Sequence, residues 1–220
     1  IKLPDGGREL PVPLWQGARY WWGGNEELAN GRMTLRRPIL VSPEGATLSF
    51  QTAYRMREGR DFLWAQASED GATWVTLTNG NTTCSHAADW IGGAYGFPDD
   101  LCAAGIGGFT GANPGYPAPD AQEFDLTAFA GKLIYLRFWY MTDAGAPLEG
   151  PFVDSVRVNA AEILLLLDDA EGPDTHWDID APWTFSNGDH TFTQNYYLQW
   201  RNVSATGGYD SALGDARWRF

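Results

Sequence analysis

The stretch FLWAQASEDGATWVTL, residues 62–77, indicates the fold class of this chain. Residues 62–68 and 73–77 are rich in the aromatic, β-branched and small apolar residues that suit a pleated, half-buried strand. Asp70 and Gly71 stand between them, and an Asp-Gly pair in this position is a strong hairpin signal because a primed turn needs positive φ. The stretch therefore predicts two antiparallel strands joined by a tight turn.

Three further segments predict strands, at residues 47–54, 133–140 and 152–158. The second is the most apolar, so we expect it to be central. With 26 Gly and 13 Pro the chain favours turns over long helices, and only a short helical turn is expected within residues 124–131. These patterns predict an all-β sandwich.

Charge narrows the possible partners. The 220 residues have a formal net charge of −13, which disfavours nucleic-acid binding because phosphate backbones need a positive protein surface. An acidic surface does favour cation binding. No apolar run reaches the length needed to span a membrane, so no membrane span is expected.

The chain has two cysteines, Cys84 and Cys102, both in a long loop rich in Gly, Asn and Ala between residues 80 and 115. A loop of that length in a compact domain tends to be functional or cross-linked. An even cysteine count in a loop-rich acidic chain predicts one disulfide and an oxidising compartment. The alternative is two unrelated thiols.

A domain boundary is expected near residues 159–162, where an apolar run begins a fresh segment. The division would give a first unit at residues 1–160 and a second at residues 161–220. A unit of about 60 residues is marginal alone. We therefore expect the second unit to be incomplete or to pack on the first.

Several motifs, taken in order, resemble the C-terminal region of immune inhibitor A-type proteases, the M6 family of secreted bacterial zinc metallopeptidases. They are YWWGG (residues 20–24), FDL (124–126), LRF (136–138), TD (142–143), VD (153–154), LDDAEG (167–172) and NYYLQWRN (195–202). The resemblance implies a MAM-like (galactose-binding-like) jelly-roll β-sandwich at residues 1–160. It also implies a small β-rich module with a Val-Glu-Gly signature at residues 161–220, which reads Ala170-Glu171-Gly172 here and looks truncated.

The resemblance further implies a secreted parent metalloendopeptidase whose catalytic domain is this region's partner. The zinc site of that family needs His-Glu-x-x-His, two imidazoles one helical turn apart plus a general base. The three histidines, His86, His176 and His190, have no such partner at i+4. We therefore expect no zinc and no catalytic residues in this chain.

Asp154 is the first candidate for a metal ligand. Alternation with period two would place Phe152, Asp154, Val156 and Val158 on one buried face, where an unpaired carboxylate is costly. A structural Ca²⁺ ion would compensate the charge, and the candidate co-ligands are Glu58, Asp61 and Asp143. The alternatives are a buried ion pair, for instance with Arg137, or an exposed edge position.

A second acidic cluster comprises Asp168, Asp169, Glu171, Asp174, Asp178 and Asp180. It lacks the EF-hand spacing, and a solvated acidic loop is the favoured interpretation over a second calcium site.

Trp90, within the long loop, is the best candidate for an exposed aromatic platform that stacks on a sugar ring. Packing in the core is the competing interpretation of the tryptophans.

Two functions follow as hypotheses. The first is a non-catalytic accessory region that supports or docks on a protease catalytic domain and aids binding of extracellular protein or polysaccharide substrates. The alternative is a carbohydrate- or cell-surface-binding module. A contiguous exposed apolar patch would favour docking, whereas exposed Trp or Tyr residues would favour sugar binding.

Overall fold

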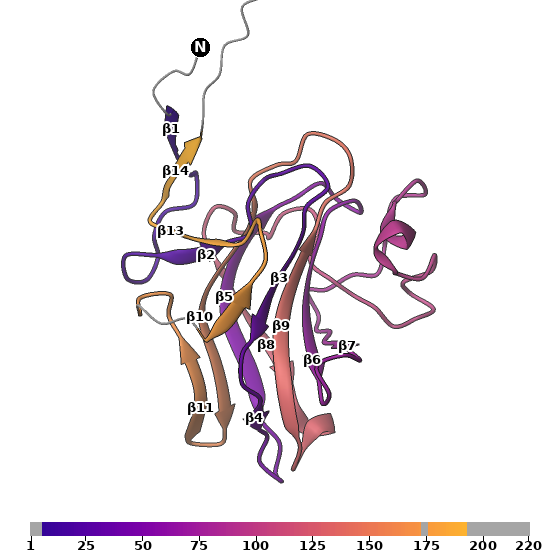
Figure 1. The fold of residues 1–220 in the computed structure, drawn as a ribbon, viewed down its shortest axis with the longest axis vertical. Coiled ribbons are helices and arrows are strands. Elements are labelled where there is room, and N and C mark those ends of the chain that lie inside the picture. Colours follow the sequence, from indigo (N-terminus) through magenta and orange to yellow (C-terminus); the bar gives the residue numbers. More distant parts are fainter. Residues whose placement is uncertain (1–5, 173–175, 193–220) are drawn as a thin grey trace, which may run out of the picture. The chain divides into compact units, whose positions relative to one another are not determined.

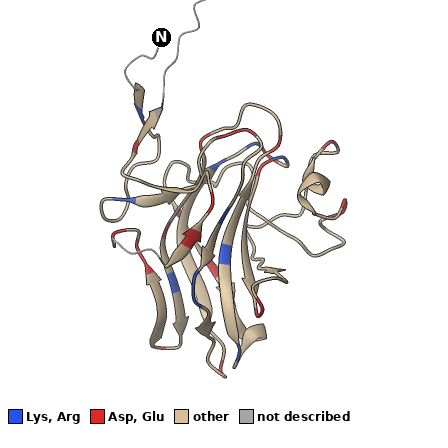
Figure 2. Cartoon of the chain, in the orientation of Figure 1, with Lys and Arg blue, Asp and Glu red and all other residues tan. Residues whose placement is uncertain are grey.

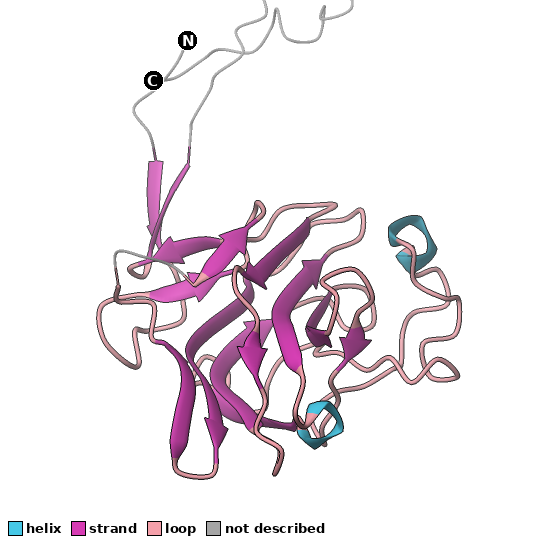
Figure 3. Cartoon of the chain, turned by 60° about the horizontal axis from the view of Figure 1, so that its bottom comes forward, coloured by secondary structure: helices cyan, strands magenta, loops and turns pink. Residues whose placement is uncertain are grey.

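The computed structural model describes residues 6–172 and 176–192, and its regular structure is almost entirely β (Figure 3). The strands are β1 (Gly6–Glu9), β2 (Tyr20–Trp22), β3 (Asn30–Leu35), β4 (Ile39–Leu40), β5 (Thr47–Arg55), β6 (Phe62–Ser68), β7 (Val75–Thr76), β8 (Asp120–Asp125), β9 (Leu133–Met141), β10 (Gly150–Ala160), β11 (Ile163–Asp168), β12 (Trp177–Ile179), β13 (Thr184–Ser186) and β14 (Asp189–Phe192). Two short 3-10 helices are η1 (Gly92–Tyr95) and η2 (Thr127–Phe129). No helix among these described residues is long and apolar enough to cross a membrane.

Two antiparallel sheets build the compact unit that spans Glu9–Asp189 (Figure 1). The first sheet has the order β13-β2-β10-β5-β8, with β11 also paired to β10. The second has the order β12-β3-β9-β6-β7, with β4 also paired to β9. The predicted β-sandwich is confirmed, and β9 is central in its sheet, as its apolar sequence predicts.

The main core lies between the two sheets because alternate residues of each strand point inward. The first sheet contributes Leu48, Phe50, Val153, Val156 and Val158, and the second contributes Met33, Leu63, Ala65, Leu136 and Phe138. Burial of this apolar surface is the main favourable term in folding, at about 25 cal/mol per Å².

The hairpin predicted at residues 62–77 forms, but its tight Asp-Gly turn does not. Strand β7 covers only two residues, and the register pairs Gln66 with Thr76, so residues 69–74 form a wider connection. Asp70 closes it, since its Oδ1 accepts the N–H groups of Ala72 at 2.8 Å and Thr73 at 2.7 Å. These local side-chain bonds compete with the two-residue turn.

The boundary expected near residue 160 lies inside the sandwich. Strand β11 pairs with β10, β12 with β3, and β13 with β2, so these three strands complete the two sheets. The apolar run that begins at Ile163 supplies the partner strand of β10 rather than the start of a separate fold. Strands β1 and β14 form a separate two-stranded sheet. The Val-Glu-Gly module predicted at residues 161–220 stays a prediction, because residues 173–175 and 193–220 lie outside the described part of the chain.

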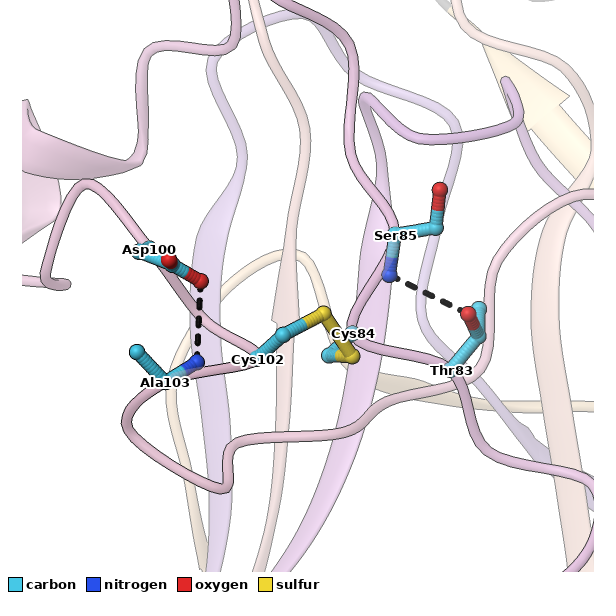
Figure 4. Close-up of a disulfide and its surroundings, with 6 residues drawn as sticks. All are labelled: Thr83, Cys84, Ser85, Asp100, Cys102 and Ala103. Atoms are coloured by element: carbon cyan, nitrogen blue, oxygen red, sulfur yellow. Dashed lines mark hydrogen bonds between the residues drawn. A yellow bond between two sulfur atoms is a disulfide. The ribbon is translucent and has the colours of Figure 1, made fainter.

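The long loop forms a second apolar cluster on the outer face of the second sheet. Phe97 and Leu101 of the loop pack with Phe62, Trp64 and Trp139 of the sheet. The predicted disulfide Cys84–Cys102 is confirmed and links two arms of this loop (Figure 4). The cross-link explains how such a long segment stays ordered with little secondary structure of its own.

Candidate functional site

Two of the four predicted calcium ligands, Asp61 and Asp143, lie together at one end of the second sheet. Asp61 precedes β6 and Asp143 follows β9, and antiparallel pairing of these strands brings the two residues together. Both are buried. The N–H of Asp143 donates to Asp61 Oδ1 at 3.2 Å, and the N–H of Arg57 donates to Asp61 Oδ2 at 3.0 Å. Burial raises the pKa of Asp61, and these two N–H donors oppose that shift.

Two arginines neutralise this end of the sheet. Arg57 Nη2 lies 2.5 Å from Asp143 Oδ1, and Arg60 Nη1 lies 3.2 Å from Asp143 Oδ2. Arg60 also reaches Asp89 in the long loop, with 2.7 Å between Nη2 and Oδ1. Glu58, the third candidate co-ligand, is exposed. Because guanidinium groups already compensate Asp143, these residues fit a structural ion-pair network better than a calcium site.

Asp154 lies in the other sheet, at the point where β10 exchanges one neighbour for another. On this side β10 pairs with β2 as far as Val153 and with β11 from Val156 onward. Ser155 adopts φ +54°, and the pairing of β10 with β5 shifts register between Asp154 and Arg157. This irregularity is a bulge, which breaks strict alternation.

The bulge overturns the predicted strand face. Val153 and Val156 both enter the main core, whereas Phe152 belongs to a smaller cluster with Leu10 and Trp22. Asp154 is fully buried, at 0% exposed, so the prediction of burial is confirmed and the exposed-edge alternative is wrong. Period-two reasoning failed because nothing in the sequence marks Ser155 as the extra residue.

The carboxyl group of Asp154 is only half satisfied. Oδ1 accepts the N–H of Ser155 at 2.5 Å, whereas Oδ2 has no hydrogen-bond partner among the described residues. The pKa of Asp154 is raised to about 7, chiefly by burial and further by the negative charges of Glu171, Asp169 and Asp168, whereas the Ser155 N–H opposes the shift. The Arg137 pairing considered from sequence is absent, because Arg137 hydrogen-bonds to Gln66 instead.

Part of the second acidic cluster surrounds Asp154, and it is not a uniformly solvated loop. Asp168 is buried, and its two carboxylate oxygens accept the indole N–H groups of Trp21 and Trp177, each at 3.0 Å. Glu171 Oε1 accepts the N–H of Arg19 at 2.8 Å. Both carboxylates accept from uncharged N–H groups, and the Arg19 guanidinium donates to the main-chain oxygen of Glu171, at 2.6 Å, rather than to a carboxylate.

The other members of that cluster are dispersed. Asp178 pairs with Arg36 at 2.9 Å and Asp180 with Arg32 at 4.0 Å, all near the surface. Asp174 lies outside the described residues. Acidic and basic positions are spread over strands and loops rather than gathered on one face (Figure 2).

The four predicted calcium candidates therefore do not form one site. Asp61 and Asp143 are joined, Glu58 is exposed, and Asp154 belongs to the neighbourhood of Asp168–Glu171. Within residues 6–172 and 176–192, no three His, Cys, Asp or Glu side chains are arranged to hold a metal ion. The buried Oδ2 of Asp154, which has no hydrogen-bond partner among the described residues, suits a cation, and it would need water or main-chain oxygens to complete a calcium shell.

Trp90 is not the exposed platform predicted from sequence. It is half-buried, with ring centroids 5.6 Å from Phe62, 5.7 Å from Phe97 and 5.0 Å from His86. It packs in the apolar cluster of the long loop because that cluster must cover the aromatic outer face of β6 and β9. The residues that sequence reasoning missed are Arg57 and Arg60, whose only signal is their closeness in sequence to Asp61.

The fold and these motifs define a MAM-type sandwich, and the chain belongs to the family described as immune inhibitor A-like, MAM domain. The family profile matches residues 9–186, which agrees closely with the compact unit Glu9–Asp189.

Two relatives are full-length proteins of which this chain matches a part. Immune inhibitor A of Bacillus thuringiensis subsp. alesti is 28% identical over 220 residues, which is 99% of this chain and 27% of that protein. Pre-pro-metalloprotease PrtV of Vibrio cholerae serotype O1 (strain M66-2) is 32% identical over 171 residues, 76% of this chain and 16% of that protein. The chain thus spans about a quarter or less of each relative's length.

Proposed function

We propose that this chain is a non-catalytic accessory region of a secreted metalloprotease and that it docks on the catalytic domain of that protein. Family membership and the names of the two relatives support a protease as the parent. The sequence lacks the His-Glu-x-x-His motif, which supports a non-catalytic role for this segment.

An exposed apolar surface carries the docking proposal. Leu40, Leu133, Ile163 and Leu164 are 58%, 54%, 65% and 52% exposed. Leu40 and Leu133 are paired across β4 and β9, and β11, which holds the other two, contacts β4. We name these four residues the apolar end. A cluster of large aliphatic side chains in water marks an interaction surface.

The tryptophans weigh against the carbohydrate-binding alternative. None of the tryptophans in residues 6–172 and 176–192 is exposed, and the large exposed apolar residues there are all aliphatic. A sugar ring stacks on a free indole face, whereas an aliphatic surface suits a protein partner.

The test is calorimetry of the full-length parent protein carrying Ile163→Ser and Leu164→Ser together. If the apolar end docks on the catalytic domain, the variant loses interdomain contact and the catalytic domain unfolds at a lower temperature than in the wild type. Leu28→Ser is the matched control, because Leu28 is similarly exposed, at 55%, but lies beside Asp143, at the end of β9 opposite Leu133. An unchanged transition of the catalytic domain in the double variant, or an equal fall in the control, contradicts the proposal.

An extracellular location is part of this proposal. The Cys84–Cys102 disulfide supports it, because such bonds persist in oxidising compartments and are rare in the cytosol. Labelling of free thiols tests this location. We expect the protein in freshly collected culture medium with neither cysteine labelled. A protein found only inside the cells, with both cysteines labelled, would contradict it.

We also propose a structural Ca²⁺ ion at Asp154, supported by its unpartnered buried oxygen and its acidic neighbours. The partner role proposed for Glu58, Asp61 and Asp143 is not carried further, because arginines occupy that network. Thermal unfolding with EDTA, followed by calcium addition, tests the ion. A melting temperature that falls with EDTA and recovers with calcium, but not in Asp154→Asn, is expected; no response to EDTA removes the ion.

A further inference from the structure

The long loop leaves part of the outer face of the second sheet uncovered. It covers Phe62, Trp64 and Trp139, and beyond its edge lies a hollow of about 430 Å³. Loop residues Phe97, Pro98 and Ile106 form one wall, β7 and Trp74 form another, and Gln66 and Arg137 are also part of the lining. The lining contains no acidic residue, in a chain with 28 of them.

Among the residues that the structure describes, Arg137 is the only charged one that lines this hollow, and none of the described carboxylates pairs with it. Its Nε donates to Gln66 Oε1 at 2.7 Å. Among the described residues it forms no ion pair, in contrast to Arg57 and Arg60. Burial, together with the positive charge of Arg32, lowers the pKa of Arg137 to about 9. An anion in the hollow would relieve both effects.

The guanidinium group of Arg137 is held in a fixed orientation. It stacks on the ring of Trp74 at 4.0 Å and lies 4.9 Å from the ring of Trp139. Gln66 is itself anchored, since its Nε2 donates to Thr76 Oγ1 at 2.9 Å. These contacts engage the faces and the Nε–H of the guanidinium, and its two terminal nitrogens have no hydrogen-bond partner in the described part of the chain. A planar pair of N–H donors held in this way matches a carboxylate in a bidentate geometry.

We propose that this hollow binds an acidic side chain, Asp or Glu, of a peptide, with its carboxylate on Arg137 and its aliphatic part against Phe97, Pro98 and Ile106. The site goes beyond docking at the apolar end, because it involves different residues and would select a partner by charge. The chain's net charge of −13 repels anions in general, so binding at Arg137 requires the local geometry.

A peptide fits the hollow better than an acidic sugar does. Trp139 is buried and stacked on Phe97, with ring centroids 4.6 Å apart, and Arg32 also lies over it at 4.4 Å. One face of Trp74 is occupied by Arg137. A uronate would therefore find little free indole surface, whereas the apolar wall suits the methylene groups of a Glu side chain.

The experiment is an NMR titration of the 220-residue chain with two blocked peptides, acetyl-Ala-Glu-Ala-amide and acetyl-Ala-Gln-Ala-amide. We expect the Glu peptide to shift the Arg137 Nε–H and the Trp74 indole N–H saturably and to bind at least about tenfold more tightly than the Gln peptide. Added salt should weaken this binding, because the carboxylate–guanidinium attraction is partly screened. Comparable shifts with both peptides, or none with either, overturn the proposal without any need for a variant.

Variants then locate the effect. Arg137→Gln should abolish the preference for the Glu peptide, whereas Arg157→Gln should preserve it, since Arg157 is exposed and lies on β10 of the other sheet. A preference that survives Arg137→Gln overturns the assignment, as does tighter binding of glucuronate than of the Glu peptide. Failure at this site would leave the calorimetric test of the apolar end unaffected.

Discussion

The two regions that bury carboxylates solve the same electrostatic problem differently. Asp143, with Asp61 beside it, is held by two arginines, and one of these also reaches the long loop through Asp89. Asp154 is buried just as fully, but within the described residues it has one N–H donor, one oxygen without a hydrogen-bond partner, and further acids nearby. The first region is an internally compensated network, whereas the second carries charge that only a proton or a cation can offset.

The difference between compensated and uncompensated buried charges indicates where a ligand is expected to bind. A compensated network stabilises the end of a sheet and gains little from a ligand. An uncompensated charge is an electrostatic cost that a ligand relieves, and this reasoning applies equally to Asp154 and to Arg137. The following variants break or sharpen this comparison, from the largest expected effect to the smallest.

Arg57→Ala should break the compensated network. It removes the closest partner of Asp143 and leaves two buried carboxylates with less positive charge. We expect the free energy of unfolding to fall by about 3–5 kcal/mol, measured by urea denaturation at pH 7. Arg55→Ala is the control, because the Arg55–Glu149 pair is near the surface and should cost below about 1 kcal/mol. Equal losses of unfolding free energy in the two variants would mean that the buried network stabilises the fold no more than a surface ion pair does.

Replacing Cys84 and Cys102 together by Ser should loosen the loop that carries Asp89. The cysteines are 18 residues apart, and the chain-entropy estimate for a loop of that size is about 3 kcal/mol. We expect this loss in urea denaturation of the oxidised protein. Dithiothreitol should lower the wild type to the same value and leave the Ser variant unchanged; a reductant effect on the Ser variant would contradict this account.

Asp154→Asn should make the uncompensated region more stable at high pH. Because the folded pKa of Asp154, about 7, lies above its unfolded value, folding is favoured when the group is protonated. That contribution is complete below about pH 4 and is lost as the pH rises through about 7. In EDTA, Asn should therefore stabilise the protein by about 2 kcal/mol at pH 8 and have little effect at pH 4.

The measurement is urea denaturation of the wild type and the variant at both pH values, first with EDTA and then with calcium. Calcium should reduce the advantage of Asn at pH 8 if the proposed ion binds, because the wild type alone gains a ligand. An Asn variant less stable than the wild type in EDTA at pH 8 would show that the ionised carboxylate is compensated after all.

Asp89→Asn should have the smallest effect. Its contact with Arg60 lies at the surface, where an ion pair contributes about 0–1 kcal/mol. The loss should shrink further in high salt, because exposed charges are screened. A loss above that range, measured by urea denaturation, would mean that the long loop contributes to the compensated network far more than its exposure indicates.

Much of the framework could be predicted from local sequence. Strands β5, β6, β9 and β10 fall where alternating aromatic and β-branched residues indicate them, and the disulfide follows from two cysteines in one loop. The connection after β6 could not be predicted from local sequence. The side chain of Asp70 accepts the backbone N–H groups of Ala72 and Thr73, and these bonds favour a wider connection over a tight Asp-Gly turn. The extent of the sandwich was also misjudged, since pairing of β11–β13 depends on strands far away in the sequence.

The sequence by itself determined the all-β class and the central position of β9, because periodicity and composition report which side chains avoid water. Two cysteines in one loop determined the cross-link. The burial of Asp154 was predicted correctly, but on a strand face that the bulge at Ser155 overturned. The tertiary structure alone decided which charges are compensated. Strand register and the bulge at Ser155 set the side chains in place: Arg57 contacts Asp143, the indoles of Trp21 and Trp177 donate to Asp168, and Arg137 has no acidic partner among the described residues. A one-residue shift in a strand exchanges its two faces, so no local pattern could have fixed these pairings.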